Sequence, residues 1–524
     1  MRKMKAENGK IAKNTIFLYI RQLVVLFISL YTSRVVLSEL GVTDYGLYNV
    51  VGGIIVIFGF ITNAISNSTS RYLSYALGTG NYREIEKTFG AFLAIYYFLG
   101  LIVLVLGETI GLWFVYNYLS IPADRFNAAI WVYQFSIFTA IMNLLYIPHN
   151  GLIVARERMS AFAFISILDA GMKLIIVYLI SISPFDKLIF YAFLIFLISC
   201  IHRLIYGFYC KRNFSETSAR LFYDKKMCIE IMKYSGWVLF SSLSFATYTQ
   251  GLNVLLNVYF GPAVNAARAV AVQVQGASQN FVTGFQTAIY PQIIKSYAQN
   301  DLHRMHTLLH VACKGSYFLF YVLAMPFLMK ADFILELWLK DVPAYAVPFT
   351  CLILIFSMLR AITNEINHAV QATGIIRNFQ VADGIMGLLI LPLSYISLEY
   401  LHTSPMSVFV ILVLMEFVTV FVRIYLGIPH IGDSIRLFIK DVLIPVLYVT
   451  IIGSLIPIII SFKTESNLLG FIMILASIMF WTVPSVFFIG LTKIERDFVM
   501  CRLKRLLQKK KACSYISNAN NSNF

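Results

Sequence analysis

Apolar runs long enough to cross a membrane follow one another along the whole chain, with short polar joints between them. As a helix, about 20 predominantly apolar residues span the roughly 30 Å hydrocarbon core of a bilayer. Each run therefore predicts one spanning helix. The pattern predicts about fourteen, at residues 14–37, 46–67, 88–109, 128–150, 161–182, 188–208, 235–258, 266–290, 315–330, 347–369, 379–399, 407–427, 441–462 and 469–491.

Composition agrees with a chain that is dissolved in lipid. Of the 524 residues, 59% are hydrophobic and 13% charged, and the mean hydropathy is +0.75, whereas soluble domains are about a quarter charged. The predicted fold class is therefore all-α, a polytopic membrane protein. The formal net charge of +16 does not indicate a nucleic-acid partner, because the basic residues lie between apolar spans.

The distribution of Lys and Arg predicts the orientation of the chain. With the N-terminus in the cytoplasm, 30 of the 42 Lys and Arg fall in cytoplasmic segments, five fall outside, and seven lie within spans. Cytoplasmic loops are rich in Lys and Arg, and one span more or fewer would reverse this distribution in every later loop. We therefore expect a multi-pass protein with both termini in the cytoplasm.

A weak internal repeat divides the chain. Residues 74–76 (Ser-Tyr-Ala) recur at 296–298, and Asn150, Ala155 and Phe162 recur as Asn367, Ala372 and Phe379. Because both sets join the same pair of spans in each half, the pattern predicts two parallel six-helix lobes, with the substrate site between them. The predicted units are an N-terminal lobe with a cytoplasmic linker (1–225), a C-terminal lobe (226–430), two peripheral helices (431–491) and a basic cytoplasmic tail (492–524).

The eighth span carries a line of polar residues. Arg268, Gln275, Gln279 and Gln286 lie within about 20° of one helical line that runs about 27 Å. Two interpretations are open: a water-lined surface, or amides that hydrogen-bond neighbouring helices. The length of the line favours the first. The opposite line reads Val270, Ala277, Phe281, Gly284 and Ala288, with Gln273 near it.

Other charged and amide residues also fall within the predicted spans, where a charge at the helix centre costs about 2.5–3.5 kcal/mol on insertion scales. Arg360 lies near mid-depth, whereas Arg423 lies near the cytoplasmic end and is interpreted as an orientation anchor. Asp169 and Lys173 are four residues apart, a spacing that favours a local ion pair over ion coupling. The remaining candidates are Arg21, Arg34, Asn63, Gln250, Asn253 and Glu365.

Motifs for chemistry are lacking. The sequence has no Walker A pattern, no Gly-rich phosphate loop and no His/Cys metal constellation, and its seven cysteines show no paired spacing. We therefore expect neither an enzyme nor a cofactor. The energy source would then be an ion gradient, the membrane potential or the gradient of the substrate itself.

Residues 33–48 include the runs Ser-Arg-Val-Val-Leu, Leu-Gly and Asp-Tyr-Gly-Leu-Tyr, which are followed by Arg-Tyr-Leu at 71–73 and Gly-Asn-Tyr at 80–82. Together with the fourteen-span plan, these runs resemble the Wzx-type polysaccharide flippases of the multidrug/oligosaccharidyl-lipid/polysaccharide (MOP) exporter superfamily. The resemblance implies a V-shaped pair of bundles in a bacterial inner membrane. It also implies alternation between inward-open and outward-open states.

The implied substrate is an undecaprenyl-pyrophosphate-linked oligosaccharide, moved from the cytoplasmic to the periplasmic leaflet for O-antigen, capsule or exopolysaccharide synthesis. Its partners would be membrane lipids and a polysaccharide polymerase or assembly complex, with the flippase itself a monomer. The pyrophosphate would be held by Arg268, Arg21, Arg34 and Arg360, and the glycan would face Gln275, Gln279, Gln286, Asn253, Gln250 and Asn63. Asp169, Lys173 and Glu365 are candidates for ion coupling. A cation-coupled multidrug exporter of the same superfamily is the alternative.

Overall fold

The fold is that of a computed structural model, in which the described residues are helical and contain no strand. The description covers residues 17–500 except 26, 29–30, 33–34, 37–38, 42–43, 45–46, 49–58, 119–120, 122, 219–223, 340–341, 494 and 498–499. Within helices, the side chains of 59–64, 118, 218 and 262 are also outside the description. Arg34 and the Asn63 side chain are therefore not placed.

The first bundle consists of helical residues between 17 and 48 and of α2–α7. Its helices are α2 (Gly59–Thr79), α3 (Tyr82–Leu106), α4 (Leu112–Tyr118), α5 (Phe126–Ala155), α6 (Met159–Ser181) and α7 (Lys187–Asn213). A π-helical turn joins α3 to α4, and the Asp186 carboxylate accepts the first free amides of α7 from Leu188 and Ile189. That cap satisfies donors that would otherwise be left unpaired at the start of the helix.

The second bundle consists of α8–α13. Its helices are α8 (Lys225–Phe260), α9 (Pro262–Ala298), α10 (Leu302–Leu339), α11 (Ala346–Thr373), α12 (Arg377–Glu399) and α13 (Met406–His430). Gly261 (φ +78°) and Pro262 separate α8 from α9, because a positive φ suits glycine and proline suits the first helical position. The largest apolar core of the described residues lies in this bundle.

Two further helical segments pack on the outer side of α10. They comprise α14 (Ile435–Phe438) and α15 (Ile444–Lys463), joined by a π-helical turn, followed by α16 (Leu468–Ser477) and α17 (Val483–Ser485). Tyr317 on α10 shares a 2.6 Å hydrogen bond with Thr450. Lys330, at the kink of α10, donates to the Thr464 carbonyl at 2.7 Å. These contacts fix the C-terminal helices to α10 at two levels.

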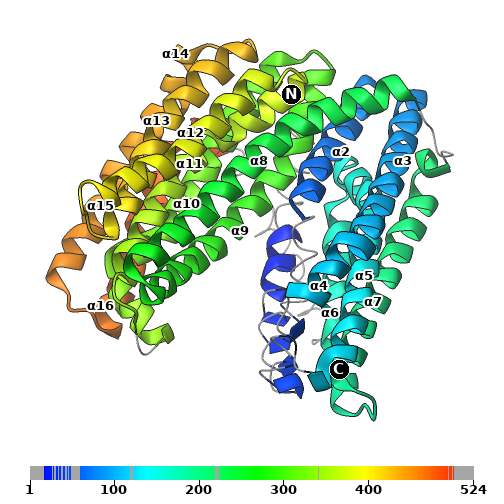
Figure 1. The fold of residues 1–524 in the computed structure, drawn as a ribbon. Helices are drawn as coiled ribbons and strands as arrows, with labels where there is room; N and C mark the ends of the chain where they lie inside the picture. The colour runs from blue at the N-terminus through cyan, green and yellow to red at the C-terminus, as the bar shows by residue number, and fades with distance from the viewer. Residues whose placement is uncertain are drawn as a thin grey trace, which may run out of the picture.

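The two bundles approach each other at one end and diverge toward the other (Figure 1). The end where they meet, called the closed end below, contains the C-terminal ends of α2, α9 and α11 and the turn between α5 and α6. Large apolar side chains are exposed on the outer faces, for example Phe98, Tyr178, Phe421 and Phe462. Such surfaces suit lipid rather than water.

The predicted all-α membrane fold is confirmed. Twelve of the predicted spans correspond in order to helical segments from α3 onward. In the described part, ten helices are long and apolar enough to cross a membrane. Neither α8 nor α9 is among them, because the amides, hydroxyls and Arg268 of these two helices lower their apolar character. The count of fourteen therefore stays approximate.

Candidate functional site

Arg71 of α2 joins the two bundles at the closed end. The residue is 6% exposed, and its guanidinium donates from Nε to the Gln371 carbonyl at 2.9 Å and from Nη2 to the Ala372 carbonyl at 3.1 Å. Both carbonyls belong to the last turn of α11, where the helix dipole attracts a cation. The rings of Tyr72 and Tyr234 lie 4.5 and 5.1 Å from the guanidinium carbon. Arg71 therefore binds the C-terminal end of α11 to the first bundle.

Glu157 makes a second contact between the bundles at this end. It occupies the turn between α5 and α6 with a positive φ of 57° and is 5% exposed. Its carboxylate accepts from Lys295 Nζ and from Gln292 Nε2 on α9, each at 2.6 Å. Arg304 in turn donates to Gln292 at 3.1 Å. The closed end is therefore held in part by polar contacts between the two bundles.

The polar line of α9 is directed into the second bundle. Arg268 is 7% exposed and donates to the Asn253 side chain and, at 2.8 Å, to the Thr249 carbonyl of α8. Gln275 donates to Ser357 of α11 at 2.7 Å. Gln286 is 6% exposed and donates to Ser316 of α10 at 3.3 Å, while Gln279 is half-buried. In this conformation three of the four residues form hydrogen bonds within their own bundle, the second of the two interpretations.

The opposite line of α9 faces the first bundle. Ala288 packs in an apolar cluster with Leu18, Val154 and Met159, and Gly284 lies against the Tyr19 ring. Farther from the closed end, the same side of the helix is exposed and presents Gln273, Ala277, Asn280 and Thr283. The interpretation of a water-lined stripe through Arg268 and Gln286 is corrected for this state. Small side chains allow the close approach of the first bundle, and the α9 amides donate to serine hydroxyls of neighbouring helices.

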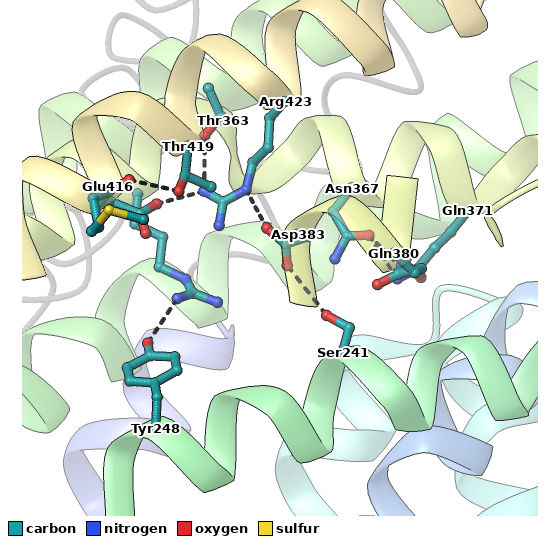
Figure 2. A network of polar contacts seen from close by, with 12 residues as sticks. Ser241, Tyr248, Thr363, Asn367, Gln371, Gln380, Asp383, Glu416, Thr419 and Arg423 are labelled. Atoms are coloured by element: carbon teal, nitrogen blue, oxygen red, sulfur yellow. Dashed lines mark hydrogen bonds and ion pairs between the residues drawn. The ribbon is translucent and has the colours of Figure 1, made fainter. Parts of the chain in front are cut away.

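Figure 2 shows a buried charge network inside the second bundle. Arg423 donates from Nε to Asp383 at 2.7 Å and from Nη1 to Glu416 at 2.5 Å and to Thr363 at 3.2 Å. Ser241 of α8 donates to the other Asp383 oxygen at 3.2 Å. Interpreting Arg423 as an orientation anchor was wrong, since it is buried and paired with two carboxylates rather than extended to the membrane surface.

A small cavity, partly open to its surroundings, lies beside this network. Arg360 of α11 lines it, donates to the Tyr248 hydroxyl at 3.4 Å and lies 4.9 Å from the Phe245 ring. Asp383 and Glu416, both held by Arg423, line the same space. Arg360 is thus a cation that lines this cavity, whereas the two carboxylates of the cavity, Asp383 and Glu416, are paired with Arg423.

The candidates of the first bundle are separate from this cavity. Arg21 is half-buried, donates to Gln22 at 3.0 Å and stacks 4.8 Å from the Phe162 ring. Its Nε has no hydrogen-bond partner among the described residues. Asp169 and Lys173 form the ion pair that their spacing predicts, at 2.9 Å.

Asn253 donates to Gln250 at 3.2 Å in the second bundle.

Six arginines differ in the charge of their partners. Arg125, Arg156 and Arg423 each form an ion pair with a carboxylate. Among the residues that the structure describes, Arg21, Arg268 and Arg360 have only neutral hydrogen-bond partners. These three cations therefore keep their charge available to an anionic ligand.

Comparison with known protein families assigns the sequence to one of them. The profile of the polysaccharide biosynthesis protein family matches residues 11–296, more than half of the chain. The chain belongs to this family. In this chain the matched residues cover the first bundle, α8 and most of α9. No curated protein matches the chain.

Solved structures with the same fold are transporters. An outward-facing multidrug resistance MATE family transporter of the MOP superfamily is 14% identical, with a TM-score of 0.70 over 80% of this chain and 96% of that one. A MATE structure in the straight conformation is 16% identical, with a TM-score of 0.70 over 81% and 96%. A MOP superfamily transporter from Pyrococcus furiosus Vc1 (DSM3638) is 13% identical, with a TM-score of 0.66 over 80% and 96%. These likenesses establish the fold, which this chain shares with transporters of the MOP superfamily.

Sequence reasoning missed the residues of the closed end. Arg71 belongs to the Arg-Tyr-Leu run that carried the family resemblance, but its partner is 300 residues away. Glu157 and Lys295 lie in short joints that looked like solvated loops. A signal was present for Lys295, since it directly precedes the repeated run at 296–298.

Proposed function

We propose that this protein is a flippase that moves undecaprenyl-pyrophosphate-linked oligosaccharide units from the cytoplasmic to the periplasmic leaflet, for O-antigen, capsule or exopolysaccharide synthesis. The match to the polysaccharide biosynthesis family is the observation that carries the substrate class. The fold supports transport by alternation between two states, because the bundles are joined at one end in part by polar contacts.

The charges of the interior suit this substrate. A pyrophosphate that crosses lipid needs cations and hydrogen-bond donors, whereas its polyprenyl tail can stay in the bilayer. Arg21, Arg268 and Arg360 have no carboxylate partner in the described part of the chain and are assigned to the pyrophosphate, with Arg34 as a fourth candidate from the sequence. In the state that receives substrate, the α9 amides Gln275, Gln279 and Gln286 would exchange partners and bind sugar hydroxyls together with Gln250, Asn253 and Asn63.

The closed end is assigned to the cytoplasmic side. The orientation predicted from Lys and Arg places the ends of α2 and α9 in the cytoplasm. The conformation described here would then be the outward-facing one, and separation of Arg71 from α11 and of Glu157 from Lys295 would admit the lipid-linked glycan from the cytoplasmic leaflet.

The deciding experiment deletes the gene and asks what accumulates. Lipid-linked glycan should collect on the cytoplasmic side and should be cleared by the wild type but not by Arg21→Ala or Arg360→Ala. Lys463→Ala is the matched control, because it removes an exposed cation remote from the interior, and it should complement fully.

The same strain distinguishes the multidrug exporter. Normal surface glycan together with hypersensitivity to cationic drugs would overturn the flippase assignment. The ion pair of Asp169 with Lys173 counts against the exporter, since a drug-binding carboxylate would need to be free of a fixed cation.

A further inference from the structure

Two histidines near the start of α10 contact acidic residues of the segment that follows α13. His306 and His310 are one helical turn apart, and their side chains are 17% and 12% exposed. Both contact the carboxylate of Asp433, which is 4% exposed. The His310 ring also packs edge-on against Phe438 of α14, with 5.6 Å between the ring centroids. These contacts attach the chain after α13 to the second bundle.

Each of the two imidazoles has an oxygen atom near both ring nitrogens. His310 Nε2 lies 2.8 Å from Asp433 Oδ2, and its Nδ1 lies 3.5 Å from Asp441 Oδ2. His306 Nε2 lies 3.0 Å from the Ile431 carbonyl oxygen, and its Nδ1 lies 3.8 Å from Asp433 Oδ1. A neutral imidazole donates from one nitrogen only, whereas an imidazolium donates from both. The oxygens of this cluster, called the histidine joint below, therefore fit the charged form of both rings.

A third basic residue continues the same face of α10. Lys314 is one turn beyond His310 and pairs at 3.0 Å with Glu495, in the segment after Gly490. The row of basic residues on α10 thus meets acids that all come after α13. Lys314 is a cation at any physiological pH, whereas imidazole side chains ordinarily change their charge between about pH 5 and 8. The two histidines therefore make part of this attachment sensitive to pH.

Other titratable groups surround this part of α10. They are Lys295 on α9, Arg304, Cys313 and Lys314 on α10, the fully buried Glu365 and His368 on α11, His430 on α13, Arg436 on α14, Lys440 and Asp441 in the π-helical turn, and Asp433 and Glu495. Among the described residues, the ion pairs of the two histidines are with Asp433 and Asp441. In the same part of the chain, no three His, Cys, Asp or Glu are placed to hold a metal ion. The ligand that fits the joint is therefore a proton.

We propose that the histidine joint is a pH-responsive attachment between the second bundle and the C-terminal helices. When His306 and His310 each bind a proton, their rings donate to Asp433, to Asp441 and to the Ile431 carbonyl and hold residues 431–441 on α10. Loss of the proton removes one donor from each ring and leaves a nitrogen lone pair facing an oxygen, which loosens the attachment. The protons come from water on the side that the predicted orientation makes cytoplasmic.

The direction of the pH effect follows from the charges. The histidines stabilise the attachment in their protonated form, so this contribution is present at low pH and lost as the pH rises through the range in which imidazoles release a proton. Asp433 must stay ionised. Burial raises the pKa of Asp433, but the hydrogen bonds from His310 and the Ser434 amide and the charges of His310 and His306 outweigh burial and lower it. The attachment should therefore be tightest in mildly acidic solution.

The joint adjoins the contacts between the bundles. Arg304, two residues before His306, donates to Gln292 at 3.1 Å, and Gln292 donates to Glu157 of the first bundle at 2.6 Å. The start of α10 thus lies between the closed end and the C-terminal helices. The proposal goes beyond the proposed function, because it assigns a regulatory input to helices outside the two bundles.

Hydrogen exchange measures the attachment. The amides of Ile431, Gly432 and Asp433 donate to carbonyls of the last residues of α13. The full chain in lipid nanodiscs, without glycan, is exchanged between about pH 5.5 and 8, and peptides covering 431–441 are analysed as protection factors, which remove the intrinsic effect of pH on exchange. Protection should fall as the pH rises, by up to about tenfold per pH unit for each histidine that binds a proton on attachment. The double variant His306→Gln with His310→Gln should lose this slope.

Two single variants test whether charge at the joint is the cause. His303→Gln is the matched control, because it removes an exposed histidine from the same helix, and it should keep the slope. His310→Lys places a permanent cation opposite Asp433, as Lys314 lies opposite Glu495, and should keep more protection at pH 8 than the wild type. In every variant, unchanged protection of α11 peptides guards against misfolding.

Three outcomes would overturn the proposal. They are wild-type protection factors that do not depend on pH, a double His→Gln variant that keeps the wild-type slope, and a slope that disappears in a chelator, which would assign the joint to a metal ion. The measurement contains no glycan. A chain that shows the slope but fails to clear lipid-linked glycan would reject the flippase function alone, and a chain that clears glycan without the slope would reject the joint alone.

Discussion

Removal of Arg71 should open the closed end. Arg71→Ala abolishes two hydrogen bonds from a charged donor to the last turn of α11, at 2.9 and 3.1 Å, and the stacking of the guanidinium on Tyr72 and Tyr234. Hydrogen bonds to charged groups contribute about 1.5–3 kcal/mol each. Part of that is regained when the open state is hydrated, so a net loss of about 2–4 kcal/mol is expected. This corresponds to a change of roughly 30- to 1000-fold in the ratio of closed to open states.

Alkylation of a buried thiol measures that ratio. Ala288 is buried between the bundles with Leu18, Val154 and Met159, so Ala288→Cys in a cysteine-free chain reacts only when the closed end separates. Its rate of alkylation should rise by the predicted factor in Arg71→Ala. Arg71→Lys keeps the charge but not the planar pair of donors and should give an intermediate rise.

Two further variants check the reasoning. A Cβ on Gly374 would lie 2.7 Å from Arg71 Nη2, and its φ of +81° disfavours other residues, so Gly374→Ala should also speed alkylation. Arg377→Ala removes an arginine that stacks on Trp237 inside the second bundle and should leave the rate unchanged. An Arg71→Ala chain that reacts at the wild-type rate would refute the role of Arg71 as a closing contact.

Three other predictions concern the remaining charge contacts. Glu157→Gln should speed alkylation of the Ala288→Cys thiol, because the two 2.6 Å contacts of Glu157 with Gln292 and Lys295 weaken. Exchange of the charges in the double variant Glu157→Lys with Lys295→Glu should restore part of the slow rate. Failure of this exchange would argue against a direct ion pair. Arg423→Gln leaves two buried carboxylates without a cation, which should lower the free energy of unfolding by about 3–5 kcal/mol. The midpoint of thermal unfolding should therefore fall by several degrees. An unchanged midpoint would contradict a stabilising role of the network. Burial raises the pKa of Asp433, which lies in the joint before α14, but the hydrogen bonds from His310 and the Ser434 amide, together with the charges of His310 and His306, outweigh burial and hold the pKa below its usual value. The stabilisation is therefore present above about pH 4 and lost as the pH falls through the folded pKa. Melting curves of Asp433→Asn should lack that acid-side loss.

Hydropathy predicted the membrane helices because one continuous apolar run is enough to identify each of them. The spans at 161–182 and 379–399, for example, coincide with α6 and α12 within a few residues. A spanning segment must be apolar along its length whatever it packs against, so the sequence contains the information locally. The kink of α10 at Lys330 lies at the end of the predicted span 315–330, and the hydropathy pattern did not show that the helix continues to Leu339.

Hydropathy did not predict which side of α9 faces the other bundle. Arg268 and Gln286 marked a polar line, and in water a polar line indicates solvent. Inside a membrane protein, polar side chains can instead donate hydrogen bonds to neighbouring helices, as Arg268 does to Thr249 and Gln286 does to Ser316. The choice depends on partners that lie elsewhere in the chain, and the small residues opposite were the better indicator of close approach.

The same argument decides which cations are available to a substrate. Arg423 and Arg360 are both arginines within apolar runs, and the sequence distinguished them only by their depth in the span. Their difference comes from Asp383, which lies 40 residues from Arg423 and on another helix. Once that acid is assigned, Arg423 becomes a structural cation and Arg360 is left with only a tyrosine hydroxyl and aromatic rings. The cations without an acid partner are therefore the ones whose loss should affect transport rather than folding.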